Sequence, residues 1–224
     1  MSQNPEIVVR RPSASVLATN KVIKNTYMLL SMTLLFSALT AGISMKINMP
    51  YMGILVTFGG YFALLFLTTR LRNSAWGILS IFALTGFMGL TLGPVINMYL
   101  RAFSNGAELV ALAMGGTGAI FIGLSSYTLT TKKDFSFMGG FLMVGILTAF
   151  LAGIAAIIFS IPLLSLALSG VFVLLMSGLI LYQTSEIIHG GETNYIMATI
   201  TLYITIYNLF MSLLHILGAV AGDD

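Results

Sequence analysis

Seven apolar stretches, each about 20 residues long, leave this chain few choices of fold. Of the charged residues, only Glu108 and Glu186 fall within these stretches. Because a bilayer offers no partners to backbone polar groups, stretches of this length are expected to be helices. The sequence therefore predicts an all-α membrane protein, a bundle of seven transmembrane helices. The expected spans are Asn25–Met45, Tyr51–Thr69, Trp76–Tyr99, Ala107–Thr130, Phe135–Phe159, Leu163–Ile188 and Tyr195–Leu217.

The first 20 residues differ from the rest of the chain. They mix Pro, Ser, Asn and charged residues without any periodicity. We expect residues 1–20 to form a mobile cytoplasmic tail, and residues 21–224 to form a single transmembrane domain.

The distribution of basic residues predicts the orientation of the bundle. With the N-terminus in the cytoplasm, the cytoplasmic segments hold eight basic residues and the outer segments hold two. Such a bias follows the positive-inside rule, so the C-terminus should lie outside, on the periplasmic side. The cytoplasmic set is Arg10, Arg11, Lys21, Lys24, Arg70, Arg72, Lys132 and Lys133, and the outer pair is Lys46 and Arg101.

Composition excludes several functional classes. Charged residues make up 8% of the chain, whereas a soluble domain carries about 25%. The net charge of +3 comes from residues spread over short loops, so nucleic acid is not an expected partner. The chain also lacks an HExxH motif, a Walker loop, a GxSxG beside a plausible base and a pair of buried carboxylates. We expect no enzymatic activity, no metal and no cofactor.

The last span carries polar groups on opposite sides. Thr201, Thr205, Asn208, Ser212 and His215 share a sector of roughly 80° on a helix with about 100° per residue. Thr199, Tyr203 and Tyr207 lie roughly opposite. Hydroxyl groups can bond to carbonyls of their own helix, but Asn and His need other partners. This pattern predicts that the last helix has neighbours on most sides and lies at the centre of the bundle.

Glycine spacing in the middle spans predicts close helix packing. Gly93-Pro94 should also kink the third span, because proline has no N–H to donate. The spaced small residues are Gly89 and Gly93, then Gly115, Gly116 and Gly118, then Gly139, Gly140, Gly145, Ala149 and Gly153.

Few ionisable groups could act at membrane depth. His215 near the outer end of the last span has an imidazole that could relay protons, or it could be a hydrogen-bonded structural residue. Glu186 and His189 stand at the cytoplasmic end of the sixth span. His189, Glu192 and Asn194 in the turn that follows are candidate contacts for a cytoplasmic partner.

Several stretches resemble the transmembrane Bax-inhibitor-motif superfamily, and its bacterial branch in particular. They are IIHGGETNYIMAT, LYITIYNLFMSLLHILG, LTTKKDFSFMGG, LGPVINMYL and NKVIKNTYMLLSMTLLFSALTA. The resemblance implies a seven-helix fold whose last helix is wrapped by the other six. It also implies a protein of the bacterial inner membrane that modulates the FtsH-type membrane AAA protease as an inhibitor and slow substrate. Membrane regulators associated with that protease are further expected partners.

Other members of that superfamily are linked to calcium leak governed by two aspartates, one in each of the last two spans. The resemblance places these positions at Gln183 and Thr205, and neither residue can hold a negative charge. Glu186 lies one turn from Gln183 but has no acidic partner in the last span. Because the carboxylate pair is missing, the protease-modulator function is favoured, and a calcium or proton leak through the bundle is the alternative. Gln183, Glu186, Thr205, Asn208 and His215 are therefore the candidate polar core or sensor positions.

Overall fold

Seven long helices account for most of the residues that the computed structural model describes, 13–222. Each is long and apolar enough to cross a membrane. A short 3-10 turn, η1 (Ser136–Met138), precedes the fifth helix. Pro162 begins the sixth helix, a position where a backbone N–H has no acceptor within the helix, so the proline costs no hydrogen bond. The helices are α1 (Ser13–Lys46), α2 (Ile54–Leu71), α3 (Trp76–Ala102), α4 (Gly106–Thr131), α5 (Gly139–Ile158), α6 (Pro162–His189) and α7 (Tyr195–Ala221).

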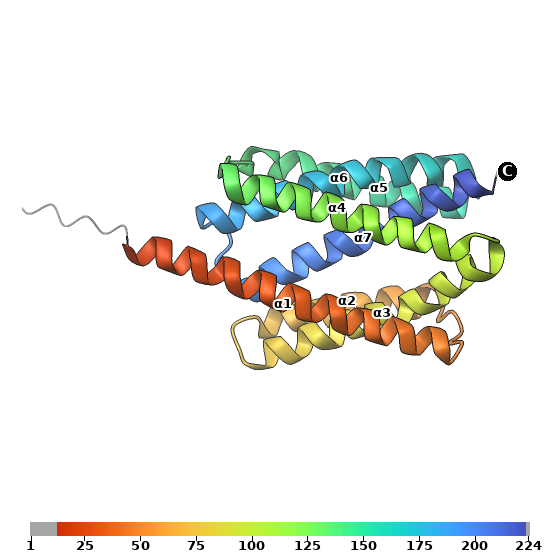
Figure 1. Ribbon diagram of the computed structural model, residues 1–224, viewed down its shortest axis with the longest axis horizontal. Coiled ribbons are helices and arrows are strands. Elements are labelled where there is room, and N and C mark those ends of the chain that lie inside the picture. The colour runs from red at the N-terminus through yellow and green to blue at the C-terminus, as the bar shows by residue number, and fades with distance from the viewer. Residues whose placement is uncertain (1–12, 223–224) are drawn as a thin grey trace, which may run out of the picture.

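Helix α1 begins at Ser13, within the segment that the sequence assigned to the N-terminal tail. Residues 1–12 lie outside the described residues, so the mobility of the tail stays a prediction. The start of α1 and the C-terminal end of α7 lie at opposite ends of the bundle (Figure 1), as an odd number of spans requires.

The helices form two groups of three with α7 running obliquely between them (Figure 1). Helices α1, α2 and α3 make one group, and α4, α5 and α6 make the other. Helix α7 packs against α1, α3, α4 and α6, whereas α2 packs mainly on α3 and α5 mainly on α6. The expectation that all six helices wrap the last one is therefore not confirmed.

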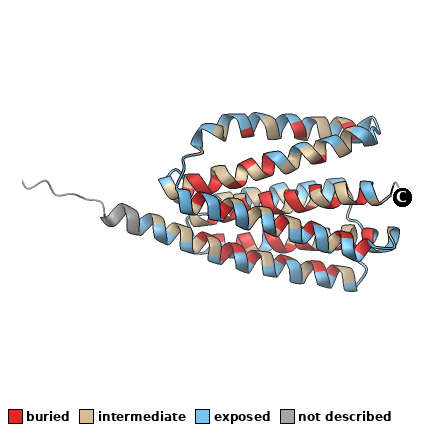
Figure 2. Ribbon diagram, turned by 45° about the horizontal axis from the view of Figure 1, so that its top comes forward, coloured by how far each residue is buried: buried red, intermediate tan, exposed pale blue. Residues whose placement is uncertain are grey.

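Burial follows these contacts, because buried residues gather where helices face one another (Figure 2). Helices α3 and α7 contribute long runs of buried side chains, whereas α2 contributes only Thr68. The outward surfaces carry large exposed hydrophobic residues such as Leu55 and Leu163, as expected for surfaces that meet lipid.

Small residues bring α1 and α3 together. Gly89 of α3 lies so close to α1 that a Cβ atom there would overlap the Ser37 carbonyl and the Thr40 hydroxyl. One turn further on, Gly93 lies equally close to Ser44. This confirms the packing role predicted for Gly89 and Gly93, because only glycine allows the backbones to approach this far.

The proline in α3 does not end the helix. Pro94 cannot donate to the carbonyl of Leu90, four residues before it. The Ser44 hydroxyl of α1 donates to that carbonyl instead, at 2.8 Å. The missing backbone bond is thus replaced by a bond between helices, at the point where glycine lets them touch.

Helix α7 is tied to the first group of helices by Tyr203. Its hydroxyl lies 2.6 Å from the Ser37 hydroxyl of α1 and donates to the Thr85 carbonyl of α3 at 3.3 Å. Because Tyr203 is almost completely buried, its hydroxyl depends on these two partners for its hydrogen bonds at membrane depth. One buried phenol therefore fixes three helices relative to one another.

Candidate functional site

The two positions that correspond to aspartates elsewhere in the superfamily are both buried. Thr205 is completely buried, and its hydroxyl donates to the Thr201 carbonyl of its own helix at 2.7 Å. Gln183 is 6% exposed, and its Nε2 is buried without a partner. Among the described residues no hydrogen bond joins the two side chains. Neither group can ionise, so a shared-proton switch is not available at this pair.

Glu186 is half-buried at the end of α6 and lies over the turn that follows. A Cβ atom at Gly191 would overlap its carboxylate, which shows how closely the turn passes. The Glu186 carbonyl accepts the N–H groups of Gly191 and Glu192, at 2.8 and 3.1 Å. Glu186 thus lies at the end of α6, against the turn that leads to α7.

His215 is bonded to α6. Its Nδ1 lies 2.7 Å from the hydroxyl of Ser169, which also donates to the Ser165 carbonyl at 3.1 Å. A serine beside a histidine is the minimum for nucleophilic catalysis, but Ser169 is buried and does not line the cavity that Asn208 borders. The geometry matches a structural pair that joins α6 to α7.

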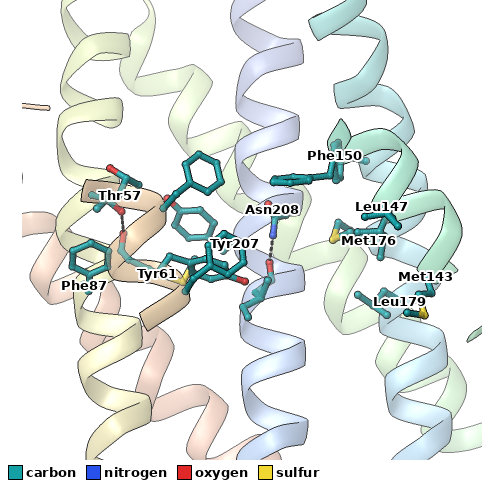
Figure 3. A pocket seen from close by; sticks show the side chains of 17 residues that line it. Thr57, Tyr61, Phe87, Met143, Leu147, Phe150, Met176, Leu179, Tyr207 and Asn208 are labelled. Atoms are coloured by element: carbon teal, nitrogen blue, oxygen red, sulfur yellow. Dashed lines mark hydrogen bonds between the residues drawn. The ribbon is translucent and has the colours of Figure 1, made fainter. Parts of the chain in front are cut away.

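Asn208 finds a partner on its own helix, contrary to expectation. Its Nδ2 donates to the Ile204 carbonyl at 2.8 Å, which leaves the second N–H and the amide oxygen uncommitted. Asn208 also lines a cavity between the two groups of helices (Figure 3). Among the described candidates for polar core or sensor positions, Asn208 is the one that lines this cavity.

Asn194 organises the turn between α6 and α7. Its side-chain oxygen caps α7 by accepting the N–H groups of Ile196 and Met197, at 3.0 and 3.1 Å. Its amide nitrogen donates to the Arg72 carbonyl and to Asn73 Oδ1, at 3.1 and 2.8 Å. One residue therefore begins α7 and joins it to the loop between α2 and α3.

Glu192 supports Asn194 from the same turn. Its Oε1 accepts the Asn194 backbone N–H at 2.7 Å. The carboxylate is thereby held beside the N-terminus of α7, where a negative charge is favourable.

A second group of hydrogen bonds at this end of the bundle joins α6 to the loop between α4 and α5. The Ser185 hydroxyl accepts the Phe135 N–H at 2.9 Å and lies 3.2 Å from His189 Nδ1. That same His189 nitrogen lies 2.9 Å from the Ser185 carbonyl. A hydrogen bond from the Ser136 backbone, above all, holds the pKa of the nearby Asp134 carboxyl below its ordinary value. Three loops thus meet at the end of the bundle that holds Arg70, Arg72, Lys132 and Lys133.

Sequence reasoning missed Asn73, Ser185 and Ser169, which complete the sites of Asn194, His189 and His215. Ser185 stands one helical turn before His189, and that spacing was a usable signal. Nothing in the sequence pairs Asn73 with Asn194, because they are 121 residues apart.

Replacing Asn194 by alanine should destabilise the protein by about 1–3 kcal/mol, because the change removes a helix cap and two bonds to a neighbouring loop. Denaturation in mixed micelles measures this. Thr193→Ala is the control, because Thr193 is exposed in the same turn. Equal unfolding midpoints for the two variants would contradict the role given to Asn194.

Comparison with known proteins points to one family. Residues 19–222 match the family Bax1-I, described as inhibitor of apoptosis-promoting Bax1. The chain is 54% identical to an uncharacterized protein of Pseudomonas aeruginosa, over 91% of each chain. It is 50% identical to the modulator of FtsH protease YccA of Escherichia coli K12 over 93% of this chain and 94% of the relative. The inner membrane protein YccA of Escherichia coli O6:H1 matches with the same identity and coverage.

Proposed function

Because the chain belongs to the Bax1-I family, we propose that it acts as its Escherichia coli relative is named to act, as a modulator of an FtsH-type membrane protease. The observation that carries this proposal is 50% identity over nearly the whole of both chains. The alignment with this relative spans 93% of the chain, so the similarity extends to all seven helices. If it is right, adding this protein to the protease should slow the degradation of another membrane substrate.

The inhibition that we propose is competition by a substrate that is hard to extract. An AAA protease pulls a chain from one end, and the N-terminus of this chain leads directly into α1. Helix α1 packs against α3, α6 and α7. Drawing it out would expose buried polar groups to lipid, at several kcal/mol for each unsatisfied group. The protease would remain bound to this protein during the slow step, and other substrates would be degraded more slowly.

The hydrogen bonds of α1 support this proposal. The Tyr27 hydroxyl lies 3.3 Å from the Thr184 hydroxyl of α6, and the Thr26 carbonyl accepts from Thr199 of α7 at 3.3 Å. Further along, Ser37 is bonded to Tyr203. These bonds are spread along the helix, so extraction must break them in succession. No catalytic group is needed for such an inhibitor.

The orientation that we propose has the N-terminus in the cytoplasm and the C-terminus in the periplasm. The basic bias supports it, and so does the clustering of the basic loops at the end where α6 meets α7. The name of the inner membrane relative supports the same membrane for this chain. The turn around Asn194 would then face the protease domain, and associated regulators of the protease would meet the bundle within the membrane.

Alkaline phosphatase fused after Asp224 should be active, because that enzyme needs export to the periplasm. The same reporter inserted after Gly191 should be inactive. An active Gly191 fusion together with an inactive Asp224 fusion would contradict the proposed orientation.

A further inference from the structure

A cavity of about 740 Å³ lies where α2, α5 and α7 would otherwise meet (Figure 3). It explains why α7 is not enclosed by all six helices. Five helices line it: α2, α3, α5, α6 and α7. On α5 the lining runs from Met143 to Phe150, near the middle of that helix, so the cavity lies at the depth of the bilayer core.

The opening of the cavity faces the lipid. Phe62, Met143 and Leu147 line it and are 52%, 74% and 57% exposed on the outer surface. The rings of Phe58 on α2 and Phe150 on α5 lie 6.2 Å apart and connect the two walls. An occupant would therefore enter sideways from the membrane, between α2 and α5.

The size of the cavity suits a small molecule. Its volume of about 740 Å³ lies within the range of small-molecule pockets, about 300–1,000 Å³.

The walls favour a planar ring. Seven of the 17 lining residues are aromatic, and three more are methionines. Aromatic side chains stack on flat rings or meet them edge-on, and methionine sulfur makes favourable contacts with ring edges. Figure 3 shows Tyr61, Phe87 and Tyr207 on one side of the space and Phe150 on the other.

Polar groups in the cavity argue against a plain acyl chain. Asn208 offers an uncommitted N–H and an amide oxygen. A hydrocarbon chain would leave these groups unpaired at a depth where water is absent. A ligand with oxygen atoms on its ring would satisfy them.

We propose that this cavity binds a neutral, membrane-soluble molecule with a planar ring that carries hydrogen-bonding oxygens and an apolar tail, the chemistry of an isoprenoid quinone. The ring lies among the aromatic residues, with a ring carbonyl accepting from Asn208. The tail leaves between α2 and α5 into the lipid. This inference is independent of the proposed protease modulation.

Decylubiquinone is a suitable probe, with the purified full chain in lipid nanodiscs and empty nanodiscs as background. Saturable binding of one quinone per protein is expected. Asn208→Leu should weaken it about tenfold, which corresponds to one hydrogen bond in an apolar site. Ile204→Phe, one turn away on the cavity floor, should abolish it by filling the space.

Ser212→Ala is the matched control, because Ser212 is buried on α7 but does not line the cavity, and it should bind like the original chain. Decane, which matches the tail of the quinone but has neither a ring nor a polar group, should bind more weakly than the quinone and should not respond to Asn208→Leu. Equal affinity for decane and quinone would show an acyl-chain groove and overturn the proposal. Absence of saturable quinone binding would overturn it as well.

Discussion

Replacing Gly89 by valine should destabilise the bundle by about 3 kcal/mol, the upper part of the range for overpacked cores. A side chain at this position would overlap the carbonyl oxygen of Ser37, which belongs to the helix backbone and cannot rotate away as a side chain could. Helix α1 would have to move away from α3. Because Ser37 is also bonded to Tyr203, the same movement would break the link between α1 and α7.

Gly115→Val is the control for this prediction. Gly115 is an exposed residue within α4, and a Cβ atom there would meet nothing within 4 Å. Reversible denaturation in mixed micelles should give a much lower midpoint for the Gly89 variant only. Equal midpoints would mean that the contact between α1 and α3 does not limit stability.

Deleting Met1–Ser15 should lengthen the lifetime of the protein several-fold in cells that contain the protease. We propose that these residues provide the end by which the protease begins to pull. The hydrophobic packing of α1 begins further on, at residues such as Val22 and Ile23, so the bundle should keep its contacts. A bound protein that cannot be pulled should also block other membrane substrates more strongly.

Pulse-chase labelling tests both halves of this prediction. A control chain carries a Gly/Ser segment of equal length in place of residues 1–15, and it should decay at nearly the original rate if length provides the grip. If the truncated chain decays as fast as the full chain, the N-terminal segment is not where pulling starts. If other substrates decay normally while the truncated chain stays bound, the bundle does not restrain the protease.

Most of the fold could be predicted from the sequence, because apolar length determines which segments cross a bilayer. All seven expected spans correspond to helices. The packing was less predictable. Gly89 and Gly93 touch α1 as expected, but Cβ atoms at Gly115, Gly118 and Gly153 would meet nothing. Glycine spacing shows that a helix has a smooth face, and only the tertiary arrangement shows whether that face meets a helix or lipid.

The burial of Gln183 and Thr205 could be predicted from the sequence, but the hydrogen-bond partners of the candidate residues could not. Gln183 and Thr205 are buried as core positions should be, yet they do not bond to each other. Asn208 was expected to need a partner on another helix, and it bonds to the Ile204 carbonyl one turn away. Helix α7 has four helical neighbours, and at Asn208 it borders a cavity.

The rate at which an FtsH-type protease degrades a second membrane protein, measured in proteoliposomes with and without this chain, tests the central claim most directly. Our account predicts that an excess of this protein slows that degradation, while the protein itself is consumed slowly and can be recovered bound to the protease. A degradation rate that stays constant over the same range of added protein would contradict the account.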